Sequence, residues 1–314
     1  MAPEISIIIP VFNEEANISP LCERLRKVVE AMGRSCEVLF VNDGSTDRTG
    51  EELRRLRHQW PALRGIELSR RFGQPAAIAA GLDAASGRAV VLMDGDLQDP
   101  PEAIPALVER WHAGAEVVYA VRATRGEAAP FRLLARCFYR LMSALAGLPI
   151  PRDAGTFSLM DRRAVEALRR MPEQHRYFPG LRAFAGFRAV GVPVDRAARA
   201  RGRSRVGGRG WTRLALDGLF AFSHAPLRLV SWLGFLAALL ALAVLASVLY
   251  KKWVTGEAIT GWASTMTAIL FMGAVQLITL GIVGEYVGRI YDEAKRRPLY
   301  IVAERIGFED DPAE

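Results

Sequence analysis

The stretch VVLMDGDLQDPPE, residues 90–102, passes from an apolar run through three aspartates to two adjacent prolines. The apolar run has the composition of a buried strand, and a proline in the first turn is typical of a helix start. The same order of strand, polar turn and helix recurs between residues 5 and 121. Strands that alternate with helices predict a doubly wound α/β fold, in which helices cover both faces of a mostly parallel sheet.

The individual elements follow from the spacing of apolar residues and from glycine and proline at their ends. The predicted strands are residues 5–11, 36–41, 63–68, 88–93, 116–121, 155–160 and 187–194. The predicted helices are residues 17–32, 46–60, 73–85 and 101–113. Gly33 and Gly114 directly follow two of these helices, as a C-terminal glycine should.

Two uncharged segments near the C-terminus, residues 229–250 and 261–284, contain 22 and 24 residues. A helix needs about 20 apolar residues to cross a bilayer. They predict a transmembrane hairpin, and two buried core helices are the alternative. Basic residues flank the outer ends of the hairpin, whereas its short connection carries only Lys251 and Lys252. The positive-inside bias therefore predicts that both termini lie in the cytoplasm.

These patterns predict a cytoplasmic catalytic domain, a juxtamembrane helix, a two-helix transmembrane hairpin and a cytoplasmic tail. Their bounds are residues 1–208, 209–228, 229–284 and 285–314. Within the first part, residues 131–146 carry arginines at four-residue spacing among apolar side chains. This segment is either a helix on an anionic membrane surface or an ordinary surface helix.

Charge and cysteine content exclude several classes of protein. The net charge is +7, but the basic residues border the membrane segments and few aromatic residues lie among them, so we expect no nucleic-acid partner. The three cysteines show no CxxC spacing, which fits a reducing cytosol without disulfides or a zinc site. The sequence also lacks GxxxxGK[ST] and GxGxxG, so it has neither a P-loop nor a dinucleotide fingerprint.

Asp94 ends the apolar run of residues 90–93, and Asp96 follows two residues later. Ligands of a doubly wound sheet bind beyond the carboxyl ends of its strands. An extended backbone would direct both carboxylates to one side, where a cation would offset their repulsion. Oxygen ligands suit Mg²⁺ or Mn²⁺, and Gln98 could add a neutral oxygen.

This acidic segment allows two other interpretations. An EF-hand calcium loop is excluded, because it needs glycine and glutamate where this chain has Asp99 and Pro105. An acidic helix entry, in which carboxylates favour the helix dipole, is the interpretation adopted for Asp99 and Glu102.

A second acidic turn follows the strand at 36–41. Asp43 lies in this turn, and Ser45 or Thr46 is expected to cap the next helix. Asp43 should therefore lie at the same edge of the sheet as Asp94. Carboxylates at neighbouring strand ends, together with a metal, predict a nucleotide diphosphate site without a P-loop. The first strand and the turn after it bring Pro10, Asn13 and Glu14 to this edge as well.

Taken together, SIIIPVFNEEANI (6–18), VNDGSTDRT (41–49), LSRRFGQPAAIAAGLDAASG (68–87) and MDGDLQDPPE (93–102) resemble the family 2 glycosyltransferases of GT-A fold. DAGTFSLMDRRAV (153–165), RARGRSRV (199–206) and the two C-terminal spans narrow the resemblance to polyprenyl-phosphate glycosyltransferases. The bactoprenol glucosyltransferases are the most similar members, and dolichyl-phosphate mannose synthases and aminoarabinose-transferring enzymes are relatives. The resemblance covers nearly the whole chain and implies a Rossmann-like GT-A domain.

The resemblance implies a role for each matching residue of the nucleotide and metal site. The metal and diphosphate motif matches Asp94, Asp96 and Gln98, and Asp96 is counted as catalytic as well. The pocket for base and ribose matches Pro10, Glu14 and Asp43. A nucleotide-proximal arginine matches Arg70.

The acceptor side is likewise implied by the resemblance. Asp153 matches an acidic residue near the reacting sugar, where it orients the acceptor or takes a proton; a capping or salt-bridging role is the alternative. Arg199, Ser204 and Arg205 match a motif that contacts phosphate. They belong to a stretch, residues 196–216, with seven arginines and no acidic residue. For the other arginines of that stretch, binding of lipid head groups is the alternative.

The implied reaction is inverting transfer of a hexose, with glucose preferred, from a UDP-sugar to a membrane polyprenyl phosphate. Transfer of mannose from GDP-mannose and transfer of an aminoarabinose-type sugar are alternatives, and a non-catalytic membrane scaffold is a hypothesis of another class. We expect an integral protein of a bacterial cytoplasmic membrane that forms homo-oligomers. The chain departs from the family pattern at three positions: Arg71 replaces the usual asparagine, Gly95 stands where alanine is common, and Val206 stands where an aromatic residue often follows the basic motif. These departures bear on sugar specificity more than on the reaction.

Overall fold

The computed structural model describes residues 3–122, 154–195, 225–250, 253–254 and 261–308. The chain divides into two compact units, which we describe separately. One is the sheet domain, Met1–Ala215 with Pro298–Glu314, and the other is Leu216–Arg297. The predicted helix at 131–146 and residues 209–224 of the predicted juxtamembrane helix lie outside the described residues, so both stay predictions.

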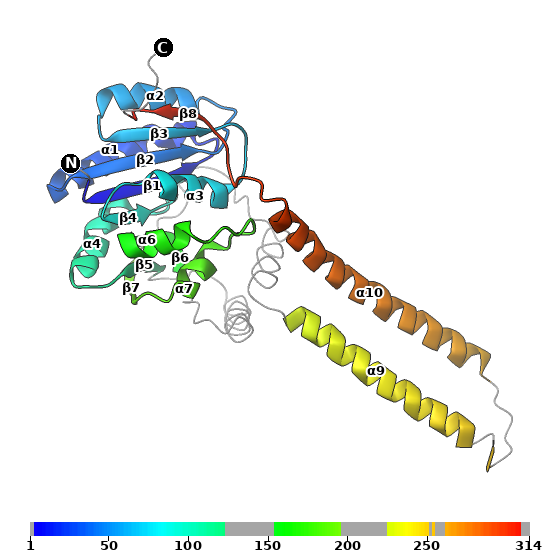
Figure 1. Ribbon diagram of the computed structural model, residues 1–314. Coiled ribbons are helices and arrows are strands. Elements are labelled where there is room, and N and C mark those ends of the chain that lie inside the picture. Colours follow the sequence, from blue (N-terminus) through cyan, green and yellow to red (C-terminus); the bar gives the residue numbers. More distant parts are fainter. Residues whose placement is uncertain (1–2, 123–153, 196–224, 251–252, 255–260, 309–314) are drawn as a thin grey trace. The chain divides into compact units, whose positions relative to one another are not determined.

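The sheet domain is built on eight strands in the order β7-β5-β6-β4-β1-β2-β3-β8 (Figure 1). β6 and β8 run antiparallel to their neighbours, and every other pair is parallel. The prediction of a mostly parallel doubly wound sheet is thus confirmed. The strands are β1 (Ile5–Val11), β2 (Cys36–Asn42), β3 (Leu63–Leu68), β4 (Ala89–Leu92), β5 (Val117–Arg122), β6 (Ala154–Asp161), β7 (Ala189–Val194) and β8 (Val302–Ile306).

The helices of this domain lie close to their predicted positions. α1 ends where its C-cap, Gly33, adopts a left-handed conformation with φ of 60°. One boundary was wrong, because α2 begins at Thr49 and the side chains of Ser45 and Thr46 do not cap it. The helices are α1 (Glu15–Met32), α2 (Thr49–Gln59), α3 (Gln74–Ala84), η1 (Pro101–Ala103), α4 (Ile104–His112), α6 (Arg162–Arg169) and α7 (Phe178–Phe184).

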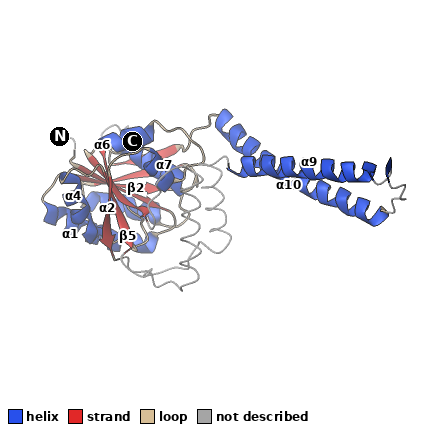
Figure 2. Cartoon of the chain, turned by 90° about the horizontal axis from the view of Figure 1, so that it is seen from below, coloured by secondary structure: helices blue, strands red, loops and turns tan. Residues whose placement is uncertain are grey.

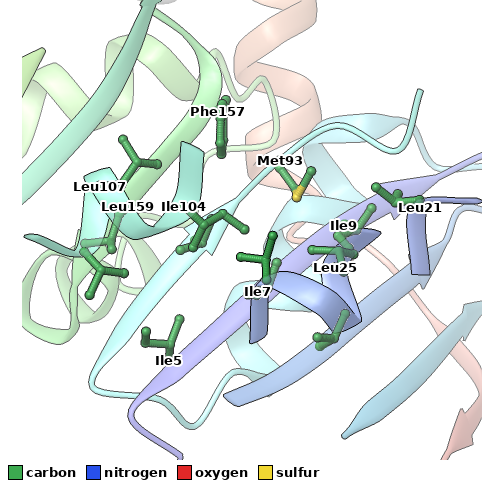
Figure 3. Close-up of a cluster of buried hydrophobic side chains, with 14 of the residues drawn as sticks. Ile5, Ile7, Ile9, Leu21, Leu25, Met93, Ile104, Leu107, Phe157 and Leu159 are labelled. Atoms are coloured by element: carbon green, nitrogen blue, oxygen red, sulfur yellow. The ribbon is translucent and has the colours of Figure 1, made fainter. Parts of the chain in front are cut away.

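Helices cover both faces of the sheet (Figure 2). On one face, alternate residues of β1 and β4 pack against α1 and α4 in a continuous apolar core. Figure 3 shows Met93 and Phe157 in this core beside Ile9, Leu21 and Ile104. On the other face α3 lies close to β1: a Cβ at Gly81 would come within 2.4 Å of Ile8 Cγ2. This close packing fixes the N-terminus of α3 at the carboxyl edge of the sheet.

The strand order reverses between β1 and β4. The chain runs from β1 to β2 and β3 in one direction and then returns to place β4 on the other side of β1. The ladder between β1 and β4 ends at Ile8 and Leu92, with one more bond from Met93 N–H to the Ile8 carbonyl (3.1 Å). Pro10 comes after this point, so its missing N–H removes no bond of that ladder. Such a switch point is where doubly wound sheets bind ligands.

The C-terminal segment returns to the sheet, although the sequence predicted only a cytoplasmic tail at residues 285–314. β8 pairs with β3, and Ser69 N–H donates to the Ile301 carbonyl (2.9 Å). Arg54 forms two hydrogen bonds with the Glu304 carboxylate (2.5 and 3.1 Å). This strand covers the backbone edge that β3 would otherwise expose.

The second unit contains α9 (Ala225–Tyr250) and α10 (Trp262–Ala294). Large apolar side chains are exposed along both helices, with Leu240 at 65% and Leu277 at 72%. In the described part of the chain, Thr265–Ala294 is long and apolar enough to cross a membrane, and Val230–Val244 is a shorter apolar stretch. The two predicted spans therefore fall on helices.

Candidate active site

Four loops converge at the carboxyl ends of β1 to β4, where the sequence predicted a ligand site. Hydrogen bonds join the loop after β1 to the loop after β2. Asn13 N–H donates to Ser45 Oγ (2.8 Å), and Thr46 N–H donates back to Asn13 Oδ1 (2.8 Å). Asn13 has a φ of 54°, a left-handed conformation that asparagine tolerates better than most residues. The two loops therefore form one connected rim beside the switch point.

Glu14, predicted in the pocket for base and ribose, is the N-cap residue of α1 and is partly exposed. Its backbone N–H donates to Thr49 Oγ1 (3.0 Å), which ties the start of α1 to the start of α2. Its carboxylate accepts a hydrogen bond from Asn17 Nδ2 (2.5 Å). Pro10, predicted in the same pocket, is buried in β1.

Asp43, the predicted base-binding residue, is only 3% exposed. Its carboxylate accepts hydrogen bonds from Phe72 N–H (2.7 Å) and Gly73 N–H (2.9 and 3.1 Å). Burial raises the pKa of Asp43 above its usual value, and these two N–H groups with the charges of Arg71 and Arg70 offset part of that rise. The hydrogen bonds from Phe72 and Gly73 hold the loop between β3 and α3 against the end of β2.

Gly44 lets this contact form. It adopts a φ of 65°, and a Cβ there would lie 2.4 Å from the carbonyl carbon of Arg70. The exposed Arg70 guanidinium lies over the ring of Phe72, with 4.1 Å from Cζ to the ring centroid. The loop with the predicted nucleotide-proximal arginine is thus packed onto the acidic turn after β2.

Asp94 and Asp96 are both partly exposed, next to the switch point. Asp94 Oδ1 accepts a hydrogen bond from Gln74 Nε2 (2.9 Å) at the start of α3. The expected extended backbone is wrong, because the loop bends between the two aspartates and Leu97 has a φ of 63°. Gln98 contributes its backbone N–H to Asp96 Oδ1 (3.1 Å). The bend, rather than strand geometry, positions Asp96.

Glu102 lies in the first turn of η1, as an acidic helix entry requires, and both Asp99 and Glu102 also make contacts that the sequence did not predict. Asp99 is fully buried, and its Oδ2 accepts a hydrogen bond from Asp94 N–H (3.1 Å). Glu102 forms two hydrogen bonds with Arg24 of α1 (2.6 and 2.9 Å). The Arg24 hydrogen bond lowers the pKa of Glu102. Both residues hold the two ends of the loop that carries Asp94 and Asp96.

The departure from the family pattern at Gly95 has a physical reason in this chain. A Cβ at this position would lie 2.7 Å from Val11 Cγ1. Real Cβ atoms avoid such distances, so a larger residue would force the loop away from β1. Glycine keeps the aspartate loop close to the end of β1.

The aspartates fit a divalent cation of the kind that nucleotide-dependent enzymes use. In the described ranges, no three His, Cys, Asp or Glu side chains gather in a complete metal cage. Mg²⁺ in substrate-phosphate sites needs only one or two protein carboxylates, because phosphates and water supply the other ligands. Asp94 and Asp96 supply that number at the ligand edge.

The remaining predicted site residues, Asp153, Arg199, Ser204 and Arg205, lie outside the described residues. Sequence reasoning missed Gln74, which holds Asp94, because a single glutamine at a helix start carries no specific signal. Sequence reasoning also missed the contact of Arg71 with the loop after β1, where its Cζ lies 4.2 Å from the ring centroid of Phe12. The departure from the usual asparagine at this position was a signal that could have drawn attention to it.

Most of the sheet domain matches a known protein family. Residues 6–169, more than half of the chain, match the model of glycosyl transferase family 2. The chain belongs to glycosyl transferase family 2. Residues 225–290 match the GtrB C-terminal hairpin, so this family 2 chain also carries that hairpin.

Relatives of this family 2 glycosyltransferase match over almost the whole chain. An uncharacterized glycosyltransferase of Synechocystis is 42% identical, with 100% of this chain and 99% of the relative covered. The bactoprenol glucosyl transferase of Shigella phage SfV is 38% identical, with 95% and 98% covered. A solved glucosyl-3-phosphoglycerate synthase of Mycobacterium tuberculosis is 20% identical and superposes with a TM-score of 0.51 over 69% of this chain and 76% of that one. This last likeness supports the GT-A fold alone.

Proposed function

We propose that this glycosyltransferase moves a hexose, with glucose preferred, from a UDP-sugar to a polyprenyl phosphate in the membrane, with inversion at the anomeric carbon. The observation that carries the proposal is the pair of partly exposed carboxylates, Asp94 and Asp96, at the switch point of the sheet. Relatives at 38% identity that are named bactoprenol glucosyl transferases support the substrate classes.

On the donor side, Asp94 and Asp96 would hold Mg²⁺ or Mn²⁺ together with the diphosphate. When bound, such an ion neutralises the negative charge that develops on the leaving nucleotide. Gln74 orients the Asp94 carboxylate, and Asp99 and Gln98 fix the backbone around the two aspartates. Pro10, Glu14, Asp43 and Arg70 would surround base, ribose and phosphate.

On the acceptor side, the nucleophile is a phosphate oxygen. It is already anionic near neutral pH, so the reaction does not demand a strong general base. Asp153 would orient the acceptor or take a proton. Arg199, Ser204 and Arg205 would bind the lipid phosphate, since guanidinium groups bind phosphate through paired hydrogen bonds.

The hairpin would anchor the enzyme in the cytoplasmic membrane of a bacterium. The apolar surfaces of α9 and α10 support this placement. The excess of basic residues at the outer ends of the hairpin supports a cytoplasmic position for both termini and the sheet domain. Such an enzyme would meet its soluble donor and lipid acceptor at the membrane surface, and we propose that it works there as a homo-oligomer.

A donor panel tests the proposal. Purified full-length protein with polyprenyl phosphate and Mg²⁺ or Mn²⁺ should transfer sugar from UDP-glucose, and UDP with the metal should raise its melting temperature. Transfer from GDP-mannose alone would assign the mannose synthase alternative. Failure with every sugar nucleotide, together with no thermal response to UDP and metal, would favour a non-catalytic scaffold.

A further inference from the structure

Arg182 of α7 is a buried cation that the site described above does not use. The residue is 5% exposed. Its Nη2 donates to the Gly155 carbonyl at a long distance of 3.4 Å, and its Nη1 is buried with no hydrogen-bond partner in the described part of the chain. Burial of a charged donor without a partner is costly, so this arrangement calls for a group that pairs with it.

Aromatic rings form the walls around this guanidinium. Its Cζ lies 5.5 Å from the ring centroid of Tyr119 and 6.0 Å from that of Phe178. Such rings attract a cation but accept no hydrogen bond of ordinary strength. Burial lowers the pKa of Arg182 to about 10, so the guanidinium still carries its charge at neutral pH. The site therefore presents a positive, desolvated donor that an oxyanion would satisfy.

The strand register places Arg182 near the carboxylate edge of the sheet. β6 runs antiparallel to β4, and Leu92 pairs with Ser158, so the start of β6 reaches past the end of β4. Gly155, which contacts Arg182, belongs to that start. The position therefore lies one strand away from the loop of Asp94.

The alternation of side chains also assigns the face. Val118 and Ala120 of β5 belong to the core on the α1 and α4 face, so Tyr119 points to the opposite face. Asp94 contacts Gln74 of α3 on that same opposite face. Arg182 and Asp94 thus share one edge and one face of the sheet.

We propose that Arg182 binds a phosphate oxygen of a substrate, next to the metal-binding aspartates and on the side of the sheet away from the nucleotide base. The oxyanion is either the donor's diphosphate or the acceptor's phosphate. This inference deepens the proposed function and rests on it for the identity of the phosphate. Nη1 would donate the hydrogen bond that is missing in the free protein.

The first test is the stability of the full-length protein in detergent without substrate. Arg182→Met should raise the melting temperature, because an apolar side chain of similar length replaces an unpaired buried charge. Arg176→Met is the matched control. Arg176 donates to the carbonyls of Leu168 (2.9 Å) and Met171 (3.0 Å), so its loss should lower the melting temperature.

The second test is the response to oxyanions. Inorganic phosphate and pyrophosphate should stabilise the wild type more than Arg182→Met, and the Arg176→Met control should respond as the wild type does. In transfer assays, Arg182→Met should lower kcat/KM by about ten- to a hundredfold, as expected for loss of a charge-assisted hydrogen bond. Arg182→Lys should retain part of this activity. A weakened apparent affinity for UDP-sugar or for polyprenyl phosphate identifies which phosphate is bound.

Three results would overturn the inference: a lower melting temperature for Arg182→Met, an undiminished response to phosphate and pyrophosphate, or unchanged transfer. Suppose that Arg182→Met lowers the melting temperature, and that the double variant with Asp153→Asn loses less than the sum of the two single variants. Arg182 would then belong to an internal ion pair with Asp153 instead. The oxyanion test needs no transfer. Failure of the wild type to transfer sugar would therefore count against the proposed function separately.

Discussion

Two kinds of aspartate lie at the same edge of this sheet. Asp43 and Asp99 are buried and accept hydrogen bonds from backbone N–H groups of their own or a neighbouring loop. Asp94 and Asp96 are partly exposed, and the loop that carries them is held by Asp99 and by the close contact of Gly95 with Val11. The difference teaches that acidic residues at strand ends differ in role: some are buried and fix the loops, and others keep a partly exposed carboxylate at the ligand edge.

The sharpest way to break this comparison is to neutralise an exposed aspartate. Asp96→Asn should lower sugar transfer by at least about a hundredfold, because a charge that stabilises the transition state is lost. Its melting temperature should stay close to that of the wild type, since the amide oxygen can still accept the Gln98 N–H. Normal turnover of the purified variant with Mg²⁺ or Mn²⁺ would refute the metal assignment.

The buried counterpart should behave in the opposite way. Asp99→Ala removes an acceptor from a fully buried position and leaves Asp94 N–H without this partner, so it should cost about 1–3 kcal/mol of stability. Thermal unfolding of the full-length protein measures the change. Transfer should fall less steeply than in Asp96→Asn when assayed well below the melting temperature. A variant as stable as the wild type would show that Asp99 does not hold the loop.

Gly44 and Gly33 allow a further comparison, because their backbone conformations are alike but the space around them differs. Gly44 and Gly33 have φ of 65° and 60°, but only Gly44 has atoms within reach of a Cβ. Gly33→Ala should cost about 1 kcal/mol from backbone strain alone. Gly44→Ala should cost more and should also weaken UDP binding, because it pushes the Arg70 loop away. Equal melting temperatures for the two variants would contradict the packing role.

The smallest expected effect is a difference between Asp43 and Asp47 in how their contributions to stability depend on pH. Burial raises the pKa of Asp43. For Asp47, burial acts in the same direction, but hydrogen bonds from Thr49 and Glu15 outweigh it and lower the pKa. The raised pKa means that Asp43 favours folding below about pH 4, and that this contribution is lost as pH rises through its folded value. The lowered pKa means that Asp47 favours folding above about pH 4 and loses this contribution as pH falls further.

Melting temperatures of Asp43→Asn and Asp47→Asn, each compared with the wild type from pH 7 to pH 3, measure both contributions. The difference for Asp43→Asn should change above about pH 4, and that for Asp47→Asn only below it. Two differences that change over the same pH interval would show that the environments of the two carboxyls have been misassigned.

The sequence predicted the sheet and the edge where the site lies, because alternating apolar runs and end signals are local. It did not predict the bend at Leu97, since a left-handed leucine is stabilised by its surroundings and has no sequence signal. The backbone contacts of Asp43 and Asp99 depend on loops that meet only in the folded chain. The burial of Arg182 was missed for the same reason, because it depends on the packing of α7 against β5 and β6.

The return of the chain to β8 changes how the hairpin relates to the enzyme. Because β3 is completed by residues that follow α10, the hairpin is an insertion within the sheet domain rather than an extension at its end. A soluble version of this enzyme would accordingly need residues 298–308 joined back to the sheet domain through a linker. A chain cut before α9 would leave the outer edge of β3 bare and prone to pair with other molecules.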